Sequence, residues 1–241
     1  MNSVWLVNLA VVAYADALAL QHRLVEARKR GAGNDTLLLL EHPPVFTLGR
    51  NANEANVIAS RESLARVGID VFRVERGGDV TYHGPGQLVG YPILDLQRFR
   101  LDVGWYVRAL EEVLLRALAD FGIAARLIEK LIGVWVDAPL EPARGQAAKL
   151  AQIGARIEQG ITYHGFALNV DPNLAHFDLI VPCGIRDKGV TAMAQVLRQP
   201  VAMHRVRERI AAHFAEVFAV ELIEITYADL LAHLETTRAP E

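Results

Sequence analysis

The stretch that decides the fold class and the site is Arg76-Gly77-Gly78-Asp79-Val80-Thr81-Tyr82-His83-Gly84-Pro85-Gly86-Gln87-Leu88-Val89-Gly90-Tyr91-Pro92. It combines five glycines and two prolines with residues that favour strands, such as Val80 and Val89. Ordinary strands contain few glycines, and ordinary loops are polar. The run is therefore typical of backbone that lies close against something else, with few side chains in between. We expect it to form the wall of a binding site.

On both sides of this run, short strand-like segments alternate irregularly with helices. The pattern predicts helices at 13–30, 60–67, 102–120 and 201–218, and strands at 36–40, 45–48, 71–74, 88–94, 126–128, 133–136, 149–153, 155–157 and 161–170. A polar segment at 138–145 is expected to be a loop. Adjacent short strands favour an α+β (α/β) fold with a mixed, largely antiparallel sheet covered by helices. No linker is visible, so a single domain over 1–241 is expected.

Composition excludes several classes of protein. The chain of 241 residues is 52% hydrophobic and carries a formal net charge of −3, so no basic field points to nucleic acid. The apolar N-terminal segment is interrupted by Asn8 and Asp16 and follows no basic segment, so it reads as a strand and a helix. No run approaches the ~20 apolar residues of a membrane span. We expect a cytoplasmic protein that binds neither membrane nor nucleic acid.

Cys183 is the single cysteine of the chain, so an internal disulfide bond is excluded. It stands in Val181-Pro182-Cys183-Gly184-Ile185, with Arg186 and Lys188 just downstream. Positive charge nearby favours the thiolate, which is the nucleophilic form of cysteine. A buried structural thiol is the alternative, because free cysteines are frequently buried.

A thiol nucleophile needs a proton acceptor or a charge partner. His83 and His164 are candidates, because each precedes glycine in a Thr-Tyr-His-Gly segment. Lys149 is a candidate of another kind, since it opens a segment of small and apolar residues where a charged amine is costly to desolvate unless an anion pairs with it. Its alternative is a lysine at a strand edge with the ammonium in water. The remaining candidates are His42, His176 and Lys188.

Neither a metal nor a cofactor is expected. No aspartate or glutamate stands at ligand spacing from the two histidines to complete a metal site. The chain has no Gly-x-x-x-x-Gly-Lys-Ser/Thr loop, and its glycines do not match the dinucleotide-binding spacing. The glycine-rich run therefore favours an apolar or neutral ligand over a phosphate group.

Four segments, in this order, make the chain resemble the octanoyltransferases of lipoate biosynthesis, also called lipoyl(octanoyl) transferases. They are 76–92, 149–157, 162–170 and 182–185, and the resemblance extends from about Leu37 to Val196. It implies a fold like the catalytic domains of lipoate and biotin protein ligases, with one octanoyltransferase catalytic domain over 1–241. The chain departs from the family pattern at Tyr163, at Ala192-Met193 and in an apparent insertion at 138–145.

The resemblance implies transfer of an octanoyl group from octanoyl-acyl carrier protein to a lysine of a lipoyl domain, through a thioester on Cys183. The implied acceptors are lipoyl domains of 2-oxoacid dehydrogenases and the glycine cleavage H protein. The family's lysine that lowers the pKa of the cysteine maps to Lys149. Substrate contacts map to Arg76, Gly77, Gly78, Asp79, Val80, Thr81, Tyr82, His83, Gln152, Ile153, Gly154, Gly165, Phe166 and Ala167.

Three other functions stay open beside this one. An ATP-dependent lipoate-protein ligase would share the fold and need no cysteine. A cysteine hydrolase would use Cys183 with His83 or His164, and a non-catalytic module would only hold an acyl carrier. If the glycines form the wall of an acyl site, a bulky residue at Gly77 or Gly78 is expected to shorten the acyl chain that is accepted.

Overall fold

The computed structural model describes residues 2–137, 147–182 and 188–237, and these form a nine-stranded sheet and a smaller three-stranded sheet. Strands of the large sheet follow the order β12-β1-β2-β6-β10-β9-β8-β7, with β11 beside β9. Their bounds are β1 Asn2–Val11, β2 Thr36–Glu41, β6 Gln87–Ile93, β7 Arg126–Ile128, β8 Leu131–Asp137, β9 Ala147–Glu158, β10 Ile161–Asn169, β11 Gly189–Val190 and β12 Val220–Glu224. Pairing is antiparallel from β2 to β7 and parallel between β12, β1 and β2 and between β11 and β9. The predicted mixed, largely antiparallel sheet is therefore confirmed.

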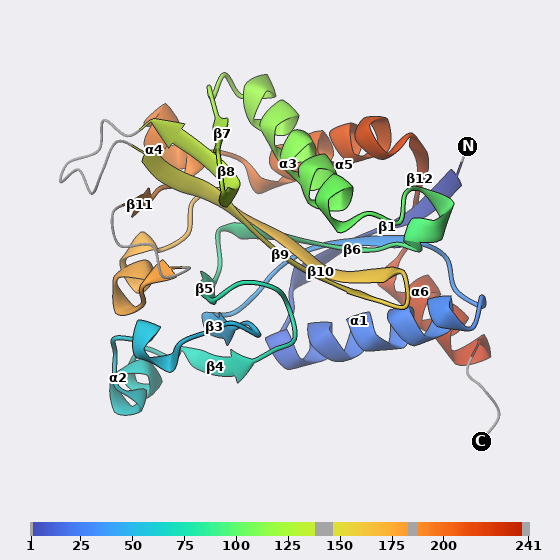
Figure 1. Ribbon diagram of the computed structural model, residues 1–241, viewed down its shortest axis with the longest axis horizontal. Helices are drawn as coiled ribbons and strands as arrows, with labels where there is room; N and C mark the ends of the chain where they lie inside the picture. Colours follow the sequence, from blue (N-terminus) through green and yellow to red (C-terminus); the bar gives the residue numbers. More distant parts are fainter. Residues whose placement is uncertain (1, 138–146, 183–187, 238–241) are drawn as a thin grey trace.

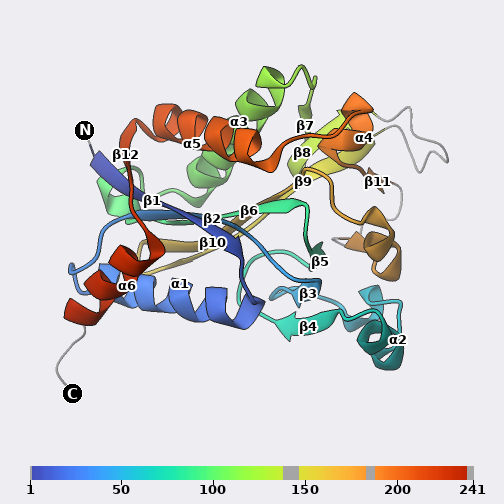
Figure 2. The same ribbon diagram turned by 180° about the vertical axis from the view of Figure 1, so that it is seen from behind.

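Helices cover both faces of the large sheet (Figure 1). Helices α3 (Val103–Asp120) and α5 (Met203–Phe218) pack on one face, where apolar side chains of both helices join a core with β6, β9 and β10. Helices α1 (Tyr14–Lys29) and α6 (Tyr227–Thr236) cover the other face and lie below the large sheet in both views (Figures 1 and 2). No helix in the described part of the chain is long and apolar enough to cross a membrane.

The small sheet lies at one end of the molecule, on the same side as α1 (Figures 1 and 2). Its order is β4-β3-β5, and α2 packs beside it. The bounds are β3 Val45–Leu48, α2 Arg61–Arg66, β4 Asp70–Arg73 and β5 Val80–His83. The glycine-rich run therefore joins the two sheets, because β5 belongs to the small sheet and β6 to the large one. At the turn between them Gly86 has a φ of +84°, and a Cβ there would overlap the carbonyl oxygen of Asp171.

Most predicted elements are present with ends shifted by one to three residues. Ser60 and Asp102 cap α2 and α3 by accepting hydrogen bonds from the backbone N–H groups of Ser63 and Trp105. The predicted break between 149–153 and 155–157 is wrong, because Gly154 pairs with Gly165 and β9 continues through it. The sequence did not predict β5, β12, α4 (Met193–Leu197), α6 or the short helices Glu54–Asn56, Leu96–Arg98 and Leu174–Leu179. The expected loop at 138–145 lies outside the described residues.

One irregularity in β9 decides which side chains face the small sheet. Trp135 of β8 pairs with Lys149, whereas Val134 pairs with Ala151, so Leu150 is an extra residue in β9. Leu150 and Ala151 both pack into the core beneath α3. Side chains alternate along the strand on either side of this bulge, so Lys149 and Gln152 share the opposite face.

Candidate active site

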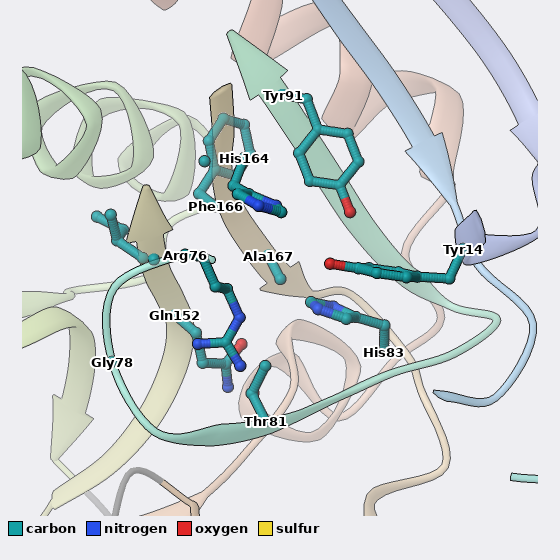
Figure 3. Close-up of a pocket in the computed structure, with 13 residues that line it drawn as sticks. Tyr14, Arg76, Gly78, Thr81, His83, Tyr91, Gln152, His164, Phe166 and Ala167 are labelled. Carbon is teal, nitrogen blue, oxygen red and sulfur yellow. The ribbon is translucent and has the colours of Figure 1, made fainter. Parts of the chain in front are cut away.

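A narrow cavity lies between the glycine-rich run and strands β9 and β10. Its volume is about 40 Å³, which is room for a few water molecules. Figure 3 shows that the rings of Tyr14, His83, Tyr91 and His164 face Arg76, Gln152 and Thr81 across this space. The lining residues are Tyr14, Arg76, Gly78, Thr81, His83, Tyr91, Gln152, Ile153, Gly154, His164, Gly165, Phe166 and Ala167.

The structure brings ten of the substrate-contact candidates together and leaves four outside the cavity lining. Val80 and Tyr82 belong to the core of the small sheet, and Tyr82 also donates or accepts a hydrogen bond with His176 Nδ1 at 2.8 Å. Asp79 accepts hydrogen bonds from the backbone N–H of Asn53 and of Val80. Gly77 donates its N–H to the Ala155 carbonyl at 3.0 Å. These four residues shape the wall from behind.

The glycines serve mainly to let other protein groups approach the backbone. A Cβ on Gly90 would overlap the ring of Phe166, which itself lines the cavity. A Cβ on Gly77 would lie 3.3 Å from the Ala155 carbonyl, so it would face β9. Gly78 does line the cavity, but its φ of +88° strains any other residue there. A bulky substitution at Gly77 or Gly78, made to test the acyl chain length that is accepted, would therefore also disturb the backbone.

Arg76 places a positive charge in the cavity wall. Its guanidinium donates to the Thr47 carbonyl at 2.5 Å, to the Asp79 carbonyl at 2.8 Å and to the Gly77 carbonyl at 2.9 Å. It also donates to the Thr47 hydroxyl oxygen, from Nε at 3.2 Å and from Nη2 at 2.9 Å. These carbonyl bonds fold the start of the glycine-rich run around the side chain. Arg76 thus orders the wall as well as charging it.

Three histidines near the cavity are buried in the neutral form. Burial lowers the pKa of His42 to about 4 and that of His164 to about 3. Burial, with the nearby His42 as a smaller cause, lowers the pKa of His83 well below its usual value. His42 bonds to the Val12 carbonyl at 2.7 Å and to the Tyr91 hydroxyl at 2.7 Å, so it is a buried structural residue. The described residues contain no cluster of three side chains suited to a metal ion.

Unpaired polar groups converge on the same cavity. Both ring nitrogens of His164, both side-chain polar atoms of Gln152 and the hydroxyl of Thr81 are buried without a hydrogen-bond partner among the described residues. His164 also has a φ of +54°, which is a strained backbone conformation for a residue with a side chain. Unpaired buried groups are costly, so these atoms are suited to bind a ligand or water.

The neutral histidines make stability depend on pH. A histidine whose pKa is lower in the folded state binds its proton first in the unfolded chain, so folding stability falls as pH drops below about 6.5. We expect the free energy of unfolding to decrease between pH 7 and pH 5, by up to ~1.4 kcal/mol per pH unit for each buried histidine. Urea unfolding at several pH values measures this slope. His42→Phe should reduce it and the exposed His204→Gln should not; an equal slope in His42→Phe would contradict the assignment.

Lys149 lies on the cavity side of β9 but outside the cavity lining. Lys149 is 4% exposed. Its Nζ donates a hydrogen bond to the Ile132 carbonyl at 3.1 Å and lies 4.6 Å from the centroid of the Trp135 ring. A carbonyl acceptor and an aromatic face both favour a positive charge. Gln152, three residues along β9, lines the cavity, so the backbones of these two residues are roughly 10 Å apart along the strand. The alternative of an exposed lysine at a strand edge is wrong.

The segment that carries Cys183 lies outside the described residues, but both of its flanks are placed. On one side, Val181 donates its N–H to the Asn56 carbonyl at 2.7 Å. On the other side, Val190 of β11 pairs with Lys149, and Thr191 donates its N–H to the Lys149 carbonyl at 3.0 Å. The chain therefore returns to β9 beside Lys149 seven positions after Cys183.

Comparisons with known proteins agree with this architecture. The family model of the lipoyl protein ligase A/B catalytic domain matches residues 13–215. An octanoyltransferase of Myxococcus xanthus is 50% identical over 224 residues, which are 93% of this chain and 62% of that protein. An octanoyltransferase of Alkaliphilus metalliredigens is 48% identical over 219 residues, which are 90% of this chain and 96% of that protein. A bipartite lipoate protein ligase from Thermoplasma acidophilum is 17% identical, with a TM-score of 0.70 over 98% of this chain and 92% of that one, and shares the fold.

The chain belongs to the lipoyl protein ligase A/B catalytic domain family. Within it, the sequence groups with the octanoyltransferases, which are acyltransferases. The family resemblance and the expected fold are thereby confirmed. Sequence reasoning did not single out Tyr14 and Tyr91 as lining residues. Tyr91 lies inside the glycine-rich run, so its position offered a signal, whereas nothing around Tyr14 did.

Proposed function

We propose that this chain transfers an octanoyl group from an acyl-carrier thioester to a lysine amine of a lipoyl domain, with Cys183 as nucleophile and Lys149 as proton carrier. One observation carries the proposal: Lys149 and the cavity share one face of β9, and β11, the strand that follows the cysteine-bearing segment, pairs with β9 at Lys149. An eight-carbon acyl group with its carbonyl carbon near Lys149 is long enough to reach the cavity.

In the first half-reaction, the thiolate of Cys183 attacks the carbonyl carbon of the donor thioester. A new carbon–sulfur bond forms to Cys183, and the bond to the carrier sulfur breaks. The ammonium of Lys149 stabilises the attacking thiolate and then gives a proton to the departing carrier thiolate. The half-reaction leaves an octanoyl thioester on Cys183, a free carrier thiol and a neutral Lys149.

In the second half-reaction, the amine of the acceptor lysine attacks the thioester carbon on Cys183. An amide bond forms, and the thiolate of Cys183 leaves. The amine loses a proton as the bond forms, and neutral Lys149 takes it up. Lys149 returns to the ammonium form and Cys183 to the thiolate, so the cycle closes without any other reagent.

The cavity supplies the binding energy for the acyl chain. Each buried methylene contributes about 0.8 kcal/mol, and Ile153, Phe166 and Ala167 give the cavity apolar lining. We infer that the unpaired groups of Gln152, His164 and Thr81 bind the polar atoms that accompany the chain.

The protein partners follow from this chemistry. We propose octanoyl-acyl carrier protein as donor, and lipoyl domains of 2-oxoacid dehydrogenases and the glycine cleavage H protein as acceptors. The chain would act as one catalytic domain in the cytoplasm. Curated octanoyltransferase relatives at 48% to 50% identity support the donor and acceptor classes.

Transfer without nucleotide tests the proposal against its rivals. With purified chain, octanoyl carrier and a lipoyl domain, octanoylation of the acceptor lysine should proceed equally with and without ATP and magnesium. Mass spectrometry of the acceptor measures the product. A requirement for ATP with free octanoate would instead indicate a ligase, and release of octanoate at the rate of transfer when no acceptor is present would indicate a hydrolase.

A further inference from the structure

A chain of buried hydrogen bonds connects the cavity wall to the backbone of Lys149. It starts at His83, whose Nδ1 lies 2.8 Å from Gln87 Oε1. Gln87 Nε2 donates to Asn169 Oδ1 at 2.8 Å, and Asn169 Nδ2 donates to the Thr191 carbonyl at 2.9 Å. Thr191 in turn donates its N–H to the Lys149 carbonyl at 3.0 Å. Gln87, Asn169 and Thr191 are each 0% exposed.

The strand register of the large sheet brings the side chains of this hydrogen-bond chain together. Asn169 of β10 is the direct cross-strand partner of Gln87 of β6, so their side chains stand side by side on one face. Val89 and Tyr91 of β6 and Ala167 of β10 belong to the core on the α1 side, so alternation along both strands places the two amides on the face of the cavity. Two buried amides at such a position would be costly without partners, and each of their side-chain oxygens and nitrogens has at least one hydrogen bond.

The hydrogen-bond partners also determine which atom donates and which accepts at each step of this hydrogen-bond chain. Gln87 Nε2 donates to the Tyr82 carbonyl at 3.1 Å as well as to Asn169, so Oε1 is the atom that faces His83. Oε1 accepts only, so His83 Nδ1 carries the proton. Because the ring is neutral, His83 Nε2 is an acceptor, and the Thr47 hydroxyl lies 3.4 Å from it. Arg76 donates to the same hydroxyl oxygen. In each successive hydrogen bond from Arg76 to Lys149, the donor therefore lies on the Arg76 side and the acceptor on the Lys149 side.

We propose that Gln87 and Asn169 are positioning residues of the transfer reaction. Through Thr191 they hold β11, which follows the cysteine-bearing segment in sequence, against Lys149, while through His83 they hold the cavity wall. The cavity and Lys149 are thereby kept in one fixed arrangement. This proposal rests on the proposed function, and neither amide touches the substrate.

Asn169→Asp tests the hydrogen bond from Asn169 to the Thr191 carbonyl, which connects the amides to β11 and Lys149. The aspartate keeps the shape and still accepts from Gln87, but it turns a carboxylate oxygen towards the Thr191 carbonyl and so loses that bond. We expect kcat for octanoyl transfer to fall roughly 10- to 100-fold, with KM for the donor nearly unchanged. The pH profile of Cys183 alkylation should also shift, and the single cysteine makes this readout specific. The exposed Gln97→Glu is the control for added charge and should change neither.

Two outcomes would overturn the proposal. A folded Asn169→Asp variant could have lower stability but wild-type kcat and a wild-type alkylation profile. That result would mean that the hydrogen-bond chain stabilises the fold and does not position the reacting groups. Nitrogen-15 NMR of the histidine rings tests the wild-type protein without any variant: His83 should carry its proton on Nδ1, and a proton on Nε2 would contradict the direction of the chain. Neither the alkylation profile nor the ring spectrum requires octanoyl transfer, so both results stand even if the wild-type protein proves to have another activity.

Discussion

Replacement of Cys183 by alanine is expected to lower octanoyl transfer by at least about 10⁴-fold, because it removes the group that forms the covalent intermediate. Urea unfolding of the alanine variant, compared with that of the wild-type protein, is the control for its folding. The assay is octanoylation of a lipoyl domain from octanoyl carrier, read by mass spectrometry.

The same variant separates catalysis from binding. Cys183→Ala should still bind the octanoyl carrier with wild-type affinity, because the described residues that line the cavity are unchanged. Wild-type transfer by this variant would reject the nucleophile and favour a ligase or a carrier-binding module. Loss of both transfer and carrier binding would also contradict the account, since it would make Cys183 part of the binding surface.

The second large effect is expected from Lys149→Ala. It removes an ammonium that is held by the Ile132 carbonyl and the Trp135 ring beside β11. Without this charge the thiolate is less stable, so the pKa of Cys183 should rise by about one unit or more. Transfer should fall roughly 10²- to 10⁴-fold, because both proton steps lose their carrier. Alkylation rate against pH measures the first effect and the transfer assay the second.

Lys149→Arg is the matched control for this prediction. Arginine keeps the positive charge but does not release its proton at accessible pH. The alkylation profile should therefore stay closer to that of the wild-type protein than in the alanine variant, while transfer stays low. An alkylation profile in Lys149→Ala that matches the wild type would remove Lys149 from the mechanism.

Local sequence patterns predicted the elements whose causes are local. The caps at Ser60 and Asp102 act within one helical turn, and the apolar stripes of α3 and α5 repeat at helical spacing. The missed strand β5 has only four residues and lies inside the glycine-rich run. The missed strand β12 is stabilised by its pairing with β1, which lies more than two hundred residues away in sequence. Such pairing leaves little trace in a short apolar segment.

In the candidate site, too, features with local causes were predicted and features that depend on tertiary packing were not. The glycine-rich run and the segments around Lys149 and Cys183 were predicted from their residues and their resemblance to a family. Tyr14 reaches the cavity only because α1 packs across β10 and β6, and the bulge at Leu150 that aligns Lys149 with Gln152 depends on the register with β8. The chain from His83 to Thr191 likewise requires the pairing of β6 with β10. These features arise from tertiary packing, so no single segment contains their signal.

The most direct test of the central claim is the intact mass of the protein after brief exposure to octanoyl carrier without an acceptor. Wild-type protein should gain one octanoyl group, peptide mapping should place it on Cys183, and neutral hydroxylamine or a lipoyl domain should remove it. Cys183→Ala should gain nothing. A stable octanoyl group on any other residue of the wild-type protein, or transfer to a lipoyl domain at full rate by Cys183→Ala, would contradict the account.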